Sequence, residues 1–60
     1  MKNRKDAARA QWYKQFEEKV LQVHPEWSGR IQWDSAVYFY TQGVALDTAV
    51  ERYIASRMAG

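Results

Sequence analysis

Apolar residues recur at steps of three and four positions over the first third of the chain. This is the spacing of one face of an α-helix. Asn3 is a suitable N-cap, and Pro25 disfavours α geometry at His24, so the pattern predicts a helix from about residue 3 to residue 23. The apolar stripe consists of Ala8, Trp12, Tyr13, Phe16, Val20 and Val23.

A second stripe of the same period lies near the C-terminus and predicts a helix over about residues 46–58. Asp47 in its first turn and Arg57 in its last turn both complement the helix dipole. Thr48 and Glu51 form an alternative capping box, which would start this helix later. The stripe consists of Leu46, Ala49, Val50, Tyr53, Ile54 and Met58.

The segment between these helices is ambiguous. Its core, "AVYFYT", is rich in β-forming residues, and residues 30–41 also fit a two-stranded hairpin that turns at Asp34 and Ser35. Helix punctuation favours the other interpretation: Asp34 is a good N-cap, and Trp33 and Tyr38 are spaced for a hydrophobic staple. We therefore predict a second helix.

The end of this second helix is indicated by Gly43. A glycine there can adopt the left-handed conformation and let Val44 close onto Phe39, which gives a helix over about residues 35–42. Three helices with short connections predict an all-α fold, a single-domain three-helix bundle over residues 1–60.

Three consecutive aromatic residues stand in the second helix, Tyr38, Phe39 and Tyr40. Successive helical residues point about 100° apart, so these rings sweep about 200° around the helix axis. One contact surface cannot cover that arc. Either the second helix is buried on both sides, or one ring stays at the surface as part of a binding patch.

Trp27 and Trp33 lie in or beside the loop "HPEWSGRIQ", away from the helical stripes. Two interpretations are open for these residues: they cover the ends of a small core, or they anchor an interface with a partner. Arg30 can stack on either ring.

Length and composition limit how the fold is stabilised. A chain of 60 residues buries only about 60% of the surface that its unfolded form exposes. It contains no cysteine and a single histidine, so we expect no disulfide, no metal site and no cofactor. A hydrophobic content of 47% argues against disorder. The fold must rest on its apolar core or on association, and a homodimer is expected.

Positive charge is concentrated at the N-terminus. The first ten residues hold four basic side chains against one acidic side chain, whereas the remainder holds five basic and six acidic ones. Such a segment either tracks phosphates as a frayed arm or only aids solubility. The basic residues are Lys2, Arg4, Lys5 and Arg9.

The stretch "AVYFYTQGVALDTAVERYI" resembles a helix-turn-helix motif, and "TQGVALDTAV" is similar to the turn region of many small bacterial regulators. The resemblance implies DNA binding, with the last helix as the recognition helix. Its outward positions hold two acids and one base, the base being Arg52. These positions are Asp47, Thr48, Glu51, Arg52 and Ser56.

Catalysis is not expected. His24 lies beside a proline in a loop, Glu17 and Glu18 point apart, and the chain contains neither a nucleophile–base pattern nor a phosphate-binding glycine loop. We expect no small-molecule substrate. The chain also lacks an apolar run long enough for a membrane span or a signal peptide. These features predict a cytoplasmic protein that does not bind membranes, of the kind found among bacterial or mobile-element accessory proteins.

Two functions remain after these exclusions. The first is a non-enzymatic protein-interaction module that self-associates through aromatic residues of the second helix and the loop before it. Its predicted contact residues are Trp27, Trp33, Tyr38 and Tyr40. The alternative is a nucleic-acid-binding or regulatory protein that uses the N-terminal basic residues together with Arg52.

Overall fold

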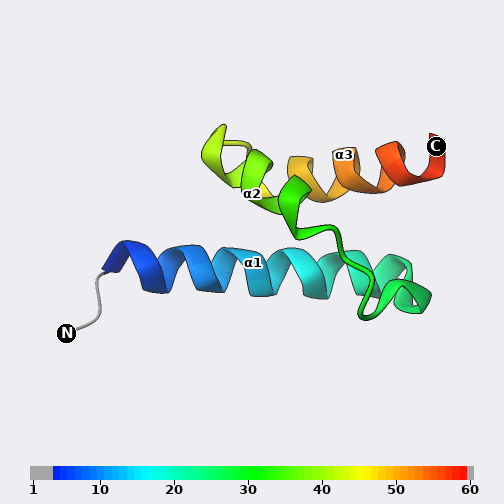
Figure 1. Ribbon diagram of the computed structural model, residues 1–60, viewed down its shortest axis with the longest axis horizontal. Helices are drawn as coiled ribbons and strands as arrows, with labels where there is room; N and C mark the ends of the chain where they lie inside the picture. The colour runs from blue at the N-terminus through cyan, green and yellow to red at the C-terminus, as the bar shows by residue number, and fades with distance from the viewer. Residues whose placement is uncertain (1–3, 60) are drawn as a thin grey trace.

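The computed structural model describes the backbone of residues 4–59 and the side chains of residues 7–59. The described part consists of α1 (Arg4–Val23), the 3-10 helix η1 (Pro25–Trp27), α2 (Trp33–Thr41) and α3 (Leu46–Ala59). The predicted all-α three-helix bundle is confirmed. Figure 1 shows two layers, in which α1 runs along the molecule and the α2–α3 hairpin lies over it. The fold is elongated, with extents of 40 × 21 × 17 Å.

Helix α1 ends where the sequence predicts. The His24 N–H still donates to the Val20 carbonyl oxygen at 2.8 Å, but the His24 backbone leaves the helical region at φ −132° and ψ 74°. Pro25 causes this exit, because its ring excludes α geometry at the preceding residue, and it then opens η1. The predicted N-cap, Asn3, lies outside the described residues.

Helix α2 begins earlier than predicted. Its N-cap is Gln32, so Asp34 lies inside the first turn, where its carboxylate complements the helix dipole. The prediction of Asp34 as N-cap is wrong, and the staple that depended on it has no basis. The Gln32 side chain makes no capping hydrogen bond. Instead, its backbone N–H donates to the Tyr53 hydroxyl at 2.9 Å, so a contact from α3 supports the start of α2.

The end of α2 has the predicted glycine cap. Gly43 has φ +75°, and its N–H donates to the Tyr40 carbonyl oxygen at 3.1 Å. The Val44 N–H donates to the Phe39 carbonyl oxygen at 3.0 Å. These two bonds form a Schellman motif, which reverses the chain and leads into α3.

Replacing Gly43 with Ala should therefore lower the free energy of unfolding by about 1–2 kcal/mol, because a Cβ is disfavoured in the left-handed region. No atom lies within 4 Å of the position of an added Cβ, so the loss would come from the backbone alone. Urea denaturation followed by circular dichroism measures it. Gly43→Asn is the control, since Asn tolerates this conformation better than Ala. Equal losses in the two variants would contradict the explanation.

The core lies between α1 and the α2–α3 hairpin. Phe16 and Val20 of α1 are fully buried, and Ala36 and Ala49 are small enough to let the helices approach closely. The complete set of buried residues is Phe16, Val20, Ile31, Ala36, Ala49, Val50 and Tyr53. Both predicted stripes supply this core through their central members.

Three residues at the ends of the stripes do not reach the core. Met58 is 67% exposed and Val23 is 59% exposed, and Ala8 is also at the surface. For Ala8 the reason is visible in Figure 1, because the N-terminal turns of α1 extend beyond the hairpin layer. Apolar periodicity identifies one face of a helix, but it does not indicate how far along the helix the partner layer extends.

Candidate interaction surface

Aromatic rings from α1 and α2 form a continuous cluster, which consists of Trp12, Tyr13, Trp33 and Tyr40. The Tyr13 ring centroid lies 6.2 Å from that of Trp33 and 5.7 Å from that of Tyr40. Tyr40 in turn meets the edge of Trp12 at 5.3 Å. Trp12 stacks on the buried Phe16 with centroids 5.6 Å apart and an interplanar angle of 11°. The aromatic cluster thus connects the core to the surface.

The outer side of α2 carries an apolar strip of Trp33, Val37 and Tyr38. Their side chains are 43%, 47% and 61% exposed, whereas Ala36 on the inner side is fully buried. Trp33 and Val37 lie one helical turn apart, and Tyr38 follows directly. The exposed Asp34 lies between Val37 and Tyr38 around the helix, so the strip carries one carboxylate among its three apolar side chains.

The rings of Tyr38, Phe39 and Tyr40 divide between surface and core. Phe39 packs against the core, and Tyr40 is half-buried in the aromatic cluster. Tyr38 is 61% exposed, and its ring makes a T-shaped contact with that of Phe39 at 5.9 Å. Of the two arrangements that the sequence left open, the structure has the one with a ring at the surface.

Trp27 belongs to a different set of contacts. Its ring is nearly parallel to that of His24, with centroids 4.1 Å apart, and it lies edge-on to Tyr53 at 6.1 Å. The cation over the Trp27 ring is Arg57 of α3, whose Cζ lies 4.8 Å from the ring centroid. The sequence suggested Arg30 for this stacking position, and Arg57 occupies it instead. Trp27 covers the core, which is one of the two roles that the sequence allowed.

His24 takes part in a local contact at the end of α1. Its Nδ1 donates to the Glu26 carboxylate at 2.9 Å. This hydrogen bond is the main cause that lowers the pKa of the Glu26 carboxyl below its usual value, and a backbone hydrogen bond adds to it. The ring stacking and the hydrogen bond together hold His24 against η1.

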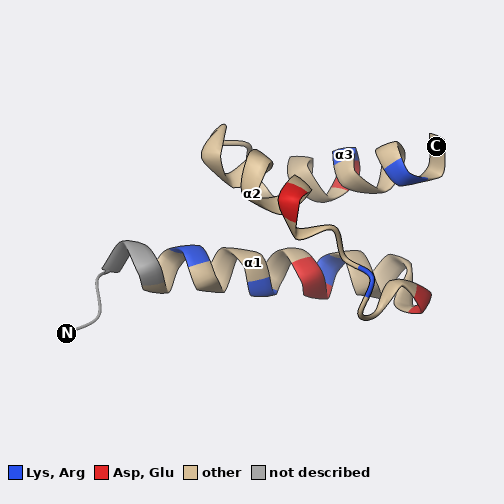
Figure 2. Cartoon of the chain, viewed as in Figure 1, with Lys and Arg blue, Asp and Glu red and all other residues tan. Residues whose placement is uncertain are grey.

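Of the candidate nucleic-acid residues, the structure describes the side chains of Arg9 and Arg52, which lie on different helices. Lys2 lies outside the described residues, and the backbone of Arg4 and Lys5 is already helical, so the expected arm is part of α1. Arg9 and Arg52 are exposed on α1 and α3. Figure 2 shows basic and acidic segments interspersed along both helices.

Of the five positions of α3 that were predicted to face outward, four are exposed and one, Thr48, is not. The exposed residues include two acids, Asp47 and Glu51, and Thr48 is half-buried. Asp47 pairs with Lys19 of α1 at 3.4 Å, across the two layers. Arg52 and Ser56 are exposed. The face that a recognition helix would present therefore carries more negative than positive charge.

Sequence reasoning missed three residues that shape the surface. Tyr13 packs against the core as its stripe predicted, but its contact with Trp33 was not predicted, and Val37 was not assigned to the surface. Arg57 was interpreted only through the helix dipole, whereas it contacts Trp27 and Tyr53. The position of Val37 one turn after Trp33 was the available signal for the strip.

No protein-family model, curated protein or solved structure matches this chain. Among the helices of residues 4–59, none combines the length and apolar character needed to cross a membrane. In the same part of the chain, no three His, Asp or Glu side chains are grouped in a way that could hold a metal ion.

Proposed function

We propose that this chain is a small, non-enzymatic protein-interaction module that self-associates through the apolar strip of α2. The observation that carries the proposal is the exposure of three large apolar side chains, Trp33, Val37 and Tyr38, on one short helix. Trp and Tyr are the residue types that most often anchor interfaces, because they bury large area with few rotatable bonds.

The strip is supported from behind, which favours association. The Trp33 ring lies edge-on to Tyr13, and Tyr13 is in contact with Tyr40. Side chains held in this way lose less conformational freedom when a partner covers them. Tyr40 therefore acts as a support for Trp33, while Trp27 supports the core.

A second copy of the chain is the partner that this molecule favours. A two-fold axis beside α2 would place each strip on its symmetry mate, so that one apolar surface covers another of the same composition. A 60-residue chain without disulfides has a small core, and burial of the strip would add stability that the monomer lacks.

The test is light scattering on a sizing column over a range of protein concentrations, at low and high salt. The wild type should form a dimer whose fraction rises with concentration and does not depend on salt, because the contact is apolar. Val37→Asp should weaken association at least about tenfold, since it places an unpaired carboxylate in the interface. Helix content should be unchanged, because Val37 is 47% exposed.

Ala55→Asp is the matched control, because Ala55 is exposed on α3 and lies outside the strip. It should leave the dimer intact. A wild type that stays monomeric at every concentration would overturn the proposal, and so would equal effects of the two aspartates. A monomer that co-elutes with a DNA duplex only at low salt would instead favour the nucleic-acid function through the basic residues of α1.

A further inference from the structure

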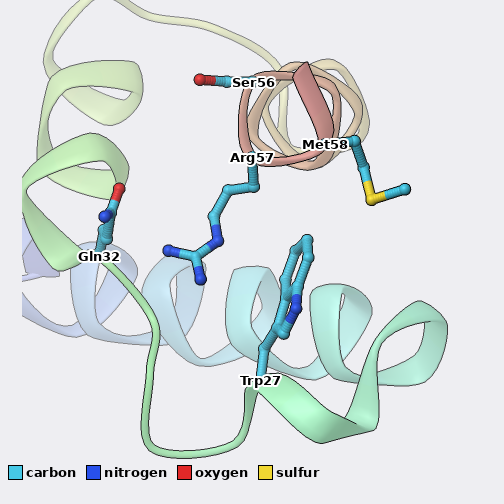
Figure 3. A pocket seen from close by; sticks show the side chains of 5 residues that line it. All are labelled: Trp27, Gln32, Ser56, Arg57 and Met58. Carbon is cyan, nitrogen blue, oxygen red and sulfur yellow. The ribbon is translucent and has the colours of Figure 1, made fainter. Parts of the chain in front are cut away.

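An open groove of about 500 Å³ lies between η1, the start of α2 and the last turns of α3. Figure 3 shows Arg57 reaching from α3 into the space between Gln32 and Trp27. Ser56 lies on the Gln32 side of this space, and Met58 lies on the Trp27 side. The groove therefore has a polar wall and an apolar wall.

Arg57 is the charged group of this groove, and it has no acidic partner within residues 7–59. Its contacts there are the rings of Trp27 at 4.8 Å and Tyr53 at 5.8 Å. The neighbouring carboxylate on η1, Glu26, is hydrogen-bonded to His24. A half-buried guanidinium held by aromatic rings keeps its N–H donors available, and these donors match a planar carboxylate.

We infer that the groove binds a carboxylate joined to an apolar body. The carboxylate would accept hydrogen bonds from the Arg57 guanidinium, with the Gln32 amide as a further donor. The apolar body would lie against Met58, which is 67% exposed, and against the edge of Trp27, because His24 and Arg57 lie over that ring. A groove of this size matches those that hold small molecules or a short chain end.

Two other ligand classes fit less well. A phosphate dianion needs more positive charge than one guanidinium supplies, and the carbonyl groups at the C-terminal end of α3 disfavour a second negative charge. A nucleobase needs an open ring face, but His24 already stacks on Trp27 at 4.1 Å and Arg57 lies over the same ring. A monovalent carboxylate avoids both problems.

The experiment is a titration of the full chain with 3-phenylpropionate, followed by amide and indole chemical shifts in nuclear magnetic resonance. Shifts should concentrate on Trp27, Gln32 and Ser56. The neutral alcohol 3-phenylpropanol should bind at least about tenfold more weakly, because it lacks the charge that Arg57 would pair with. Equal binding of the acid and the alcohol would overturn the inference, as would shifts spread over the whole molecule.

Two substitutions at one position make the test specific. Arg57→Gln should lower affinity for the acid at least about tenfold, and Arg57→Lys should lower it less, because lysine keeps the charge but not the paired donors. Arg52→Gln is the matched control, an exposed arginine on the same helix, and should change affinity less than about twofold. If Arg57→Gln weakens the fold, Arg57→Lys still tests the inference. Unchanged affinity of Arg57→Lys for 3-phenylpropionate would overturn the role of the planar guanidinium.

The natural source of the carboxylate can be distinguished with peptides. A short peptide ending in Phe with a free C-terminal carboxylate is compared with the same peptide amidated at its C-terminus. Preference for the free peptide over 3-phenylpropionate assigns the groove to a protein chain end, and the reverse assigns it to a small acid. Because the groove uses none of the residues of the apolar strip, this result is independent of self-association.

Discussion

Phe16→Ala is expected to lower the free energy of unfolding by about 3–5 kcal/mol, the range for a large aromatic residue removed from a core. Phe16 is fully buried, with its ring stacked on Trp12 at 5.6 Å and edge-on to Tyr53 at 5.3 Å. A chain of this length has a total stability of about 3–9 kcal/mol, so the variant should be largely unfolded at room temperature.

Thermal and urea denaturation followed by circular dichroism measure this effect. Val23→Ala is the control, because Val23 belongs to the same predicted stripe of α1 but is 59% exposed. It should change the free energy of unfolding by less than about 0.5 kcal/mol. Similar losses at the two positions would mean that the core does not lie where the structure places it.

Loss of Phe16 would also affect the apolar strip. Phe16 supports Trp12, and Trp12 is in contact with Tyr13 and Tyr40, which stand behind Trp33. Stability and association should therefore fall together in Phe16→Ala, whereas Val37→Asp should reduce association alone. This difference distinguishes residues that support the strip from the core from residues that contact the partner directly.

The sequence predicted α1 and α3 well because their apolar stripes are long and regular. It also predicted the cap at Gly43, since a Schellman motif is built from neighbouring residues. The predicted start of α2 was wrong for a physical reason. The observed N-cap, Gln32, is held by the Tyr53 hydroxyl, and Tyr53 lies 21 positions away in the sequence. Asp34 offered a local capping signal that the fold does not use.

The candidate surface was predictable in part. Trp33 and Tyr38 lay outside any core stripe, and both are exposed. Trp27 had the same appearance in the sequence, but it covers the core, because Tyr53 and Arg57 of α3 meet its ring. Contacts between the loop and α3 depend on how the two layers pack, and no local pattern encodes that packing.

Tyr53→Phe is expected to lower the free energy of unfolding by about 1–3 kcal/mol, although it removes only one oxygen. Tyr53 is 2% exposed, and its hydroxyl accepts a hydrogen bond at 2.9 Å from the Gln32 N–H at the N-cap of α2. Without that oxygen, a half-buried N–H loses its partner while the ring still fills its place in the core.

Tyr38→Phe is the control for this experiment, because Tyr38 is 61% exposed and should lose less than about 0.5 kcal/mol. Hydrogen exchange at the Gln32 amide gives a local measure: its protection should fall in Tyr53→Phe and stay constant in Tyr38→Phe. Unchanged protection in Tyr53→Phe would show that water or another acceptor holds this amide equally well.

The Tyr53 hydroxyl also relates the two proposed surfaces to one another. Gln32 lines the groove, and the next residue, Trp33, begins the apolar strip. A looser Gln32 should therefore weaken both self-association and the binding of 3-phenylpropionate, while Val37→Asp affects the first alone and Arg57→Gln the second alone. If Tyr53→Phe reduced stability but left both kinds of binding intact, the start of α2 would not position either surface.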